Sequence, residues 1–213
     1  MDAQTSDRLF PRGAKIIVYN KTSMTHPPVD PSKTPLLKKL SGHLKTVHMH
    51  RALVREHCFK CGLYMQGLTH DLTKFSSGEL FPSIKYYQGY RSPYPYEKEL
   101  KGYSMGWLRH KGRNPHHWEY WYDTLEGKWQ PIAMPDIYLA ESVCDRIAAC
   151  KTYNKDRYTD RDALNYFLNK PDKDYMHPLT ARKMEKLLRM VAEFGEDRAF
   201  AYIKDCLRNH KPI

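Results

Sequence analysis

A histidine and an aspartate stand next to each other at His70 and Asp71, in the segment THDLTKFS, and no other pair in the chain is as well suited to metal chemistry. A neutral imidazole nitrogen and an anionic carboxylate oxygen are both good ligands for transition metals. The carboxylate can also bridge two ions when further ligands converge on it. The pair therefore predicts a metal site.

Further histidines and a second aspartate are candidates to complete that site. The candidate ligands are His50, His70, Asp71, His110, His116, His117 and Asp145. A single inward histidine is more often a core residue, but burying several imidazoles and two carboxylates without a cation is costly. Such a set suits two divalent transition-metal ions, with iron, manganese, zinc, nickel and cobalt all acceptable. We interpret His43, His48 and His57 as surface or supporting groups.

The composition limits the class of protein. The chain has 213 residues, enough for one well-buried core, and 41% of them are hydrophobic. No apolar run approaches the roughly 20 residues that cross a bilayer. The first residues, MDAQTSDRLFPRG, do not resemble a secretory signal. We therefore expect a soluble, cytoplasmic protein without a membrane partner.

The formal net charge of +11 favours anionic partners, namely phosphorylated small molecules, nucleotides or nucleic acid. The basic residues are spread along the chain with no run of five or more, so a solvated basic surface also explains them. Charge alone does not choose between these interpretations.

The five cysteines are an odd number, which favours reduced thiols over a disulfide framework. Cys58 and Cys61 form one CxxC pair, but no second CxxC pair completes a four-sulfur zinc site. We expect these thiols to act as small apolar residues on helix faces.

The spacing of apolar residues predicts an all-α fold. Over residues 36–65 they recur at intervals of three and four, which predicts a helix that ends at Gly62 and points His50 inward. A second short helix is expected to carry the His-Asp pair and to end near residues 76–78.

Residues 86–107 are rich in tyrosine, glycine and proline, which predicts a loop suited to form a lid, followed by a short helix that reaches His110. A later helix is expected to begin near Pro135 and to place Glu141 and Asp145 on one face.

Asn114 and Pro115 are typical of a helix N-cap and first helical position. The two histidines that follow would then lie in the first turn, where the helix dipole keeps imidazoles neutral. The run WEYWY is expected to continue this helix and to bury Trp121.

Residues 1–34 carry several prolines around the strand-like segment at 15–19, which predicts an extended N-terminal arm. Residues 35–213 are expected to form a single helical domain. It should end in an amphipathic helix or helix pair over residues 180–209, with a break at Gly195.

The order of the candidate ligands resembles that of the HD-domain superfamily of metal-dependent phosphohydrolases. The resemblance implies an HD-domain-like helical bundle in which His50, His70, Asp71 and Asp145 hold one metal. It implies that His110, His116 and His117 recruit a second metal. It also implies that Lys74, three residues after Asp71, contacts a phosphate.

A closer resemblance, over residues 40–205, is to an uncharacterised family of small bacterial and phage proteins. The motifs THDLTKFS, KYYQG and NPHHWEYW carry it. This second resemblance implies no function.

Together these observations predict a metal-dependent phosphohydrolase that acts on a nucleotide or another phosphorylated small molecule through a binuclear site. Asp71 and Lys74 are the predicted catalytic residues. The predicted substrate-binding residues are Lys74, Arg109, Lys111 and Arg113. Two alternatives remain open: a mixed-valence diiron oxygenase with the HD fold, and a non-catalytic, metal-stabilised module that binds nucleic acid.

Overall fold

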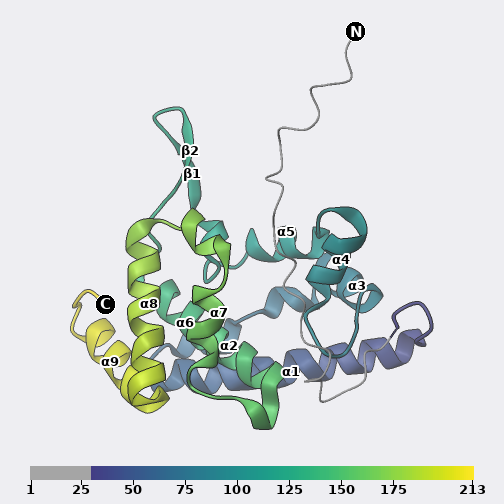
Figure 1. Cartoon of the computed structure of the whole chain (residues 1–213), viewed down its shortest axis with the longest axis horizontal. Helices are drawn as coiled ribbons and strands as arrows, with labels where there is room; N and C mark the ends of the chain where they lie inside the picture. The colour runs from purple at the N-terminus through teal and green to yellow at the C-terminus, as the bar shows by residue number, and fades with distance from the viewer. Residues whose placement is uncertain (1–29) are drawn as a thin grey trace.

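Helices make up nearly all of the regular structure in the computed structural model, which describes residues 30–213 (Figure 1). The α-helices are α1 (Leu36–Lys60), α2 (Tyr64–Thr69), α3 (Ser77–Lys85), α4 (Pro93–Lys101), α5 (Met105–Lys111), α6 (Asp136–Asn154), α7 (Asp162–Leu168), α8 (Pro178–Phe194) and α9 (Glu196–Arg208). Short 3-10 helices are η2 (Leu72–Phe75), η3 (Trp118–Tyr120), η4 (Lys155–Arg157) and η5 (Pro171–Tyr175). The predicted all-α class is confirmed for this part of the chain, while the predicted strand at 15–19 lies outside it.

Helix α1 is the longest element and runs along the base of the molecule in Figure 1. It ends at Lys60, and Gly62 follows with a φ of +80°. This left-handed conformation suits glycine because a side chain would be strained there. The predicted helix and its end near Gly62 are therefore confirmed. The helix contacts α2, α3, α6 and α9.

The main hydrophobic core draws its side chains mostly from α1, α6, α8 and α9. Its fully buried side chains include Val54, Cys58, Leu139, Val143, Ile147, Leu187, Leu188, Val191 and Ile203. Each buried aliphatic side chain contributes about 1.5–3 kcal/mol relative to an exposed one. This packing fixes α1 and α6 against each other, and both helices carry candidate metal ligands.

The predicted later helices are also confirmed. Helix α6 spans the predicted segment, and α8 and α9 are separated at Gly195, which has a φ of +82°. The cysteines are free, and Cys58, Cys61, Cys144 and Cys206 are buried in the core, as expected for small apolar side chains.

The segment between α1 and α6 is more helical than predicted. Helix α3 begins at Ser77, where the sequence pattern predicted a helix end. The irregular part of the predicted lid is short, since α4 already begins at Pro93. Pro93 occupies the first turn of that helix, where the missing N–H costs nothing.

The prediction of a helix that starts at Asn114 is wrong. The Asn114 side chain does not cap a helix, because its amide donates to Thr73 Oγ1 at 2.9 Å and to the His110 carbonyl at 2.7 Å. Residues 115–117 form a turn, and η3 covers only residues 118–120. Trp121 is half-buried against the core, so its packing role is confirmed although the run WEYWY is not a continuous helix.

A β-hairpin that the sequence pattern missed follows η3 and projects from the helices (Figure 1). Strand β1 (Tyr122–Leu125) pairs antiparallel with β2 (Lys128–Pro131), with Leu125 opposite Lys128. Both residues of its turn, Glu126 and Gly127, have positive φ angles, as a two-residue hairpin turn of type I′ requires.

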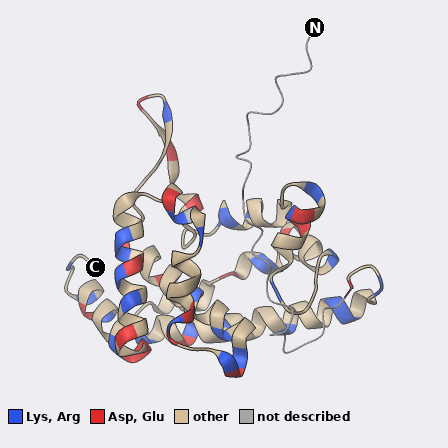
Figure 2. Ribbon diagram, viewed as in Figure 1, with Lys and Arg blue, Asp and Glu red and all other residues tan. Residues whose placement is uncertain are grey.

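Lysine and arginine are distributed over most of the helices and mixed with acidic residues (Figure 2). In the part of the chain that the structure describes, no helix has the length and apolar character needed to cross a membrane.

Candidate metal centre

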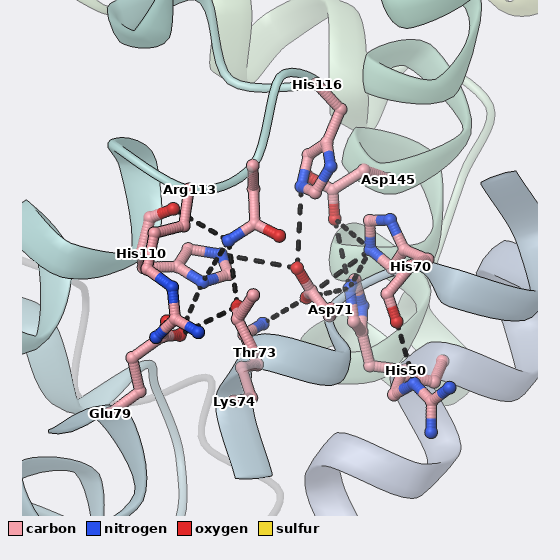
Figure 3. Close-up of polar contacts among 12 residues, drawn as sticks. His50, His70, Asp71, Thr73, Lys74, Glu79, His110, Arg113, His116 and Asp145 are labelled. Carbon is pink, nitrogen blue, oxygen red and sulfur yellow. Dashed lines mark hydrogen bonds and ion pairs between the residues drawn. The ribbon is translucent and has the colours of Figure 1, made fainter. Parts of the chain in front are cut away.

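The His-Asp pair lies at a break in the helical path rather than within a helix, which corrects the prediction. Helix α2 ends at Thr69, and η2 begins at Leu72. Asp71 has a left-handed backbone conformation with a φ of +56°, which costs about 1–3 kcal/mol for a residue with a side chain. Arg51 on α1 supports this conformation, because its Nε donates to the His70 carbonyl at 2.8 Å. The break turns both side chains toward α1 and α6 (Figure 3).

A first ligand group, formed by His50, His70, Asp71 and Asp145, gathers on one side of Asp71 (Figure 3). His50 Nε2 lies 3.0 Å from Asp145 Oδ1 and 3.6 Å from Asp71 Oδ2. His70 Nε2 lies 3.3 Å from Asp71 Oδ2 and 3.6 Å from Asp145 Oδ1. Helix α1, the α2–η2 break and α6 thus each supply at least one donor atom to the same point.

A second ligand group, formed by Asp71, His110, His116 and His117, gathers on the other side. Asp71 Oδ1 lies 3.3 Å from His110 Nε2 and 3.5 Å from His116 Nε2. One donor atom from each of the four residues lies within 4.8 Å of the others. Asp71 therefore belongs to both groups and turns one oxygen toward each. All seven predicted ligands come together.

These donors fit metal ions in both spacing and chemistry. Two ligands that each lie about 2.1 Å from one ion are separated by roughly 3.0–3.4 Å, depending on the coordination geometry. Most of the separations within each group are close to this range. In addition, Asp71 Oδ1, His116 Nε2 and His117 Nε2 are buried atoms with no hydrogen-bond partner among the described residues. Leaving such atoms unpaired is costly, and a bound cation would remove that cost.

Two buried glutamates hold the histidines from behind. Glu141 Oε1 lies 2.9 Å from His70 Nδ1 and 3.1 Å from His116 Nδ1. Glu79 Oε2 lies 2.8 Å from His110 Nδ1. An ionised carboxylate only accepts hydrogen bonds, so each Nδ1 donates, and in the neutral imidazole Nε2 then turns its lone pair toward Asp71. This is the arrangement by which proteins orient histidine ligands.

The sequence pattern pointed to one of these two glutamates and not to the other. Glu141 lies one helical turn before Asp145 on α6, on the face where the pattern placed it, although no role was assigned to it. Glu79 is fully buried near the start of α3 and had no periodic or motif signal at all. Only the tertiary contact with His110 reveals its role.

Charges within the centre favour a cation. Burial acts to raise the pKa of Asp71, but the neighbouring His70, Lys74 and His110 outweigh it and hold that pKa well below its usual value. Burial also acts to raise the pKa of Asp145, and hydrogen bonds from histidines outweigh it there too. Both carboxylates are therefore anionic, as metal ligation requires.

The histidines differ in their proton affinity. Burial, reinforced by the neighbouring His116 and His110, holds the pKa of His117 well below its usual value, so its imidazole is neutral. Burial acts to lower the pKa of His70, but Asp71, Asp145 and Glu141 outweigh it and raise the pKa. The same oxygens that attract a proton to His70 would attract a metal ion in its place.

Lys74 is the one predicted substrate-binding residue that touches a ligand directly. Its Nζ lies 2.5 Å from Asp71 Oδ2. Burial acts to lower the pKa of Lys74, but the charge of Asp71 outweighs it and raises the pKa, so the ammonium stays charged. Lys74 thus places a fixed positive charge beside the shared carboxylate.

The other predicted substrate-binding residues lie farther from the ligands. Arg113 donates to Ser76 Oγ at 3.0 Å and lies 3.5 Å from Glu79 Oε1. Arg109 is exposed and donates to the Gly78 carbonyl at 3.1 Å. Lys111 is half-buried at the end of α5. Their role in binding a substrate stays a prediction.

The remaining histidines of α1 correct one interpretation. His48 is exposed, as expected for a surface group, but His43 and His57 are buried, with exposed fractions of 5% and 0%. The helix turns both toward neighbouring elements because they lie one heptad from His50 on the same face. Neither belongs to a ligand group.

The fold and the site together define an all-α protein with a buried His/Asp centre able to hold metal. The chain belongs to a family of unknown function, DUF5662, whose model matches residues 39–190 and so includes every candidate ligand. No curated protein and no solved structure matches the chain.

Proposed function

We propose that this protein is a metal-dependent phosphohydrolase that uses two ions to cleave a phosphate from a nucleotide or another phosphorylated small molecule. The observation that carries the proposal is the shared carboxylate of Asp71, which turns one oxygen toward each ligand group. The chain order of His50, the His-Asp pair and Asp145 resembles the HD-domain superfamily and supports the same chemistry.

Two bound ions would lower the pKa of a bound water and offset the negative charge that develops on the phosphoryl group. The protein's own part is to fix the geometry. Asp71 holds the two ligand groups together, while Glu141 and Glu79 keep the imidazole nitrogens aimed at them. Lys74 adds a positive charge that would neutralise one phosphate oxygen.

We expect a substrate to approach the first ligand group beside Asp145 and Lys74. Their side chains are 17% and 19% exposed, whereas those of Asp71, His70, His110 and His116 are 2% exposed or less. A phosphate approaching from this side would meet the ammonium of Lys74 next to the first ligand group. The proposal therefore predicts that this side is the entrance.

The test is metal analysis of the purified protein combined with phosphate release. Protein loaded with manganese, iron, cobalt, nickel or zinc would be incubated with a panel of nucleotides and phosphorylated sugars. We expect two ions per chain and phosphate release from at least one substrate with at least one metal. Fully loaded protein that releases no phosphate from any member of the panel would contradict the proposal.

The same measurements separate the two alternatives. An oxygenase would retain two irons after anaerobic purification, show a mixed-valence signal in electron paramagnetic resonance and consume dioxygen. A nucleic-acid-binding module would bind oligonucleotides with strong salt dependence, and Asp71→Ala would leave that binding intact in folded protein.

A further inference from the structure

Thr73 is a polar residue beside the candidate metal centre that the proposed mechanism does not use. It lies on η2, two residues after Asp71, and its hydroxyl donates to Glu79 Oε2 at 3.2 Å (Figure 3). The same oxygen accepts from His110 Nδ1 at 2.8 Å. Thr73 and the candidate ligand His110 therefore meet at one carboxylate oxygen, on a glutamate that is fully buried.

Asn114 links Thr73 to the histidines of the second ligand group. It is 6% exposed, and its side-chain amide donates to Thr73 Oγ1 at 2.9 Å and to the His110 carbonyl at 2.7 Å. These bonds use both amide protons, and the His110 Nδ1 proton goes to Glu79. The 3.1 Å approach of the amide nitrogen to Nδ1 is therefore a contact without a hydrogen bond. The Asn114 backbone carbonyl accepts from the His117 N–H at 3.0 Å.

These hydrogen bonds all run in one direction, toward Glu79. A threonine hydroxyl has one proton to donate and lone pairs to accept another, so Thr73 accepts from Asn114 while it donates to Glu79. We call Asn114, Thr73 and Glu79 the Thr73 chain. Valine has nearly the same shape as threonine but can neither donate nor accept, so it would interrupt the chain.

The Thr73 chain joins the two segments that supply the second ligand group. One segment is η2, which begins directly after Asp71. The other carries His110 at the end of α5 and Asn114 in the turn that leads to the remaining two histidines. The hydrogen bond between Thr73 and Asn114 thus helps to set the distances from Asp71 Oδ1 to the histidine nitrogens, which are 3.3 and 3.5 Å for His110 and His116.

Arg113, a predicted substrate-binding residue, forms a second link between the same two segments. Its Nη1 donates to Ser76 Oγ at 3.0 Å, and that hydroxyl donates to the Thr73 carbonyl at 2.6 Å. The Arg113 side chain is 49% exposed, so solvent weakens its contribution. The buried link through Asn114 therefore carries most of the positioning.

The first ligand group depends on different packing. His50 and Asp145 lie on α1 and α6, which contact each other and share the main hydrophobic core. Loss of the hydrogen bond between Thr73 and Asn114 would leave that core unchanged. Its effect should therefore fall on the second group.

We propose that Thr73 and Asn114 are positioning residues that set the affinity of the second ligand group for its ion. This inference rests on the proposed two-ion function. It gives the two residues a role toward one ion and not the other.

The test measures zinc affinity at each ligand group separately, by competition with a chelator. Asp145→Ala removes a ligand of the first group, so the ion that remains reports on the second. His117→Leu removes a ligand of the second group, so the ion that remains reports on the first. Added to the Asp145→Ala protein, Thr73→Val should lower the zinc affinity about 10-fold to 100-fold, the range for a lost contact behind a ligand. Added to the His117→Leu protein, it should leave the affinity unchanged.

Three further variants separate positioning from general stability. Thr73→Ser keeps the hydroxyl and should retain most of the zinc affinity. Thr46→Val is the matched control, because the Thr46 hydroxyl donates to the Gly42 carbonyl within α1, and it should change neither affinity. Asn114→Leu removes the same hydrogen bond from its other end and keeps the inference testable if Thr73→Val does not fold. Since both changes act on one bond, the double variant should lose little more affinity than either single variant.

Equal losses at the two ligand groups, or no loss at the second, would overturn the inference and assign Thr73 to the stability of the fold. Equal effects of Thr73→Ser and Thr73→Val would also overturn it.

Failure of the two proposals is distinguishable, because the affinity measurement needs no turnover. A loss confined to the second group, in a protein that releases no phosphate, would contradict the hydrolase function and leave the inference standing. Phosphate release with an unchanged affinity for the second ion in Thr73→Val would overturn the inference and leave the hydrolase function standing. Unaltered protein that binds only one zinc ion would contradict both.

Discussion

Two clusters of polar side chains lie against α1, one partly buried around His57 and one buried around Asp71, and they differ in whether their atoms are satisfied. In the cluster around His57, Nδ1 lies 3.3 Å from the Cys144 carbonyl and Nε2 lies 3.3 Å from Lys151 Nζ. Lys151 and Tyr158 both donate to Glu196, at 2.5 and 2.7 Å. We call His57, Lys151, Tyr158 and Glu196 the His57 network. In the candidate metal centre, by contrast, Asp71 Oδ1 and two imidazole nitrogens, His116 Nε2 and His117 Nε2, have no hydrogen-bond partner among the described residues.

A buried histidine therefore does not by itself indicate a metal ligand. His57 has both ring nitrogens occupied, and it ties α1 to α6 and α9. Three of the candidate ligands, His70, His110 and His116, have Nδ1 held by a glutamate and Nε2 turned toward Asp71. An oriented nitrogen without a partner is the feature that distinguishes a ligand from a structural residue.

The largest difference should appear between two variants, each of which replaces a carboxylate of one cluster by its amide. Asp71→Asn removes the charge that both ligand groups share, so we expect loss of bound metal and at least about a 1,000-fold fall in phosphate release. Glu196→Gln should lower stability but leave the metal content unchanged. Inductively coupled plasma mass spectrometry measures the metal content of both variants, and a phosphate assay measures their activity. Retention of two ions by the Asp71 variant would remove the distinction between the clusters.

A smaller effect should separate the two supporting glutamates. Glu141 holds one histidine of each ligand group, whereas Glu79 holds one of the second group only. Glu141→Gln should therefore lower the affinity for both ions by about 10-fold to 100-fold, whereas Glu79→Gln should lower the affinity for only one of them. Competition with a chelator measures the two affinities. Glu56→Gln, at an exposed position of α1, should change neither, and equal losses in all three variants would contradict the assignment.

In metal-free protein, the His57 network should make the free energy of unfolding depend on pH in the acid range. Burial lowers the pKa of His57 below that of the unfolded chain, so the unfolded state takes up the proton first as pH falls. The contribution of His57 to the free energy of unfolding is then complete above about pH 6.5. It is lost below that pH, by at most about 1.4 kcal/mol per pH unit. His57→Gln should flatten this part of the profile in urea unfolding at pH 7, 6 and 5. An unchanged slope would show that His57 does not titrate with folding.

The smallest effect should come from a single hydroxyl of the His57 network. Tyr158→Phe removes its hydrogen bond to Glu196 and should cost about 1 kcal/mol in the free energy of unfolding, with no change in metal content. Tyr202→Phe is the matched control, because its hydroxyl accepts from Lys186 at an exposed position. It should cost less than about 0.5 kcal/mol. Equal costs would indicate that the network is no more stabilising than a surface contact.

Much of the fold followed from the sequence because its long helices are strongly periodic. The helix around His50, the helix around Asp145 and the break at Gly195 were all predictable from apolar spacing and glycine. The short elements were not. The preference of Asn114 to cap a helix was overridden by its contacts with Thr73 and the His110 carbonyl, and the hairpin after η3 has too few apolar residues to show a period.

Residue type alone indicated which side chains are able to bind metal, since an adjacent His-Asp pair and the later histidines and aspartate are good ligands in any fold. The packing of distant elements assigned these side chains to two ligand groups. It turned one oxygen of Asp71 toward each group, placed Glu79 and Glu141 behind the histidines and gave His57 partners that remove it from the site. The physical reason is that residue type sets which bonds an atom can form, whereas packing of distant helices sets which partners it meets.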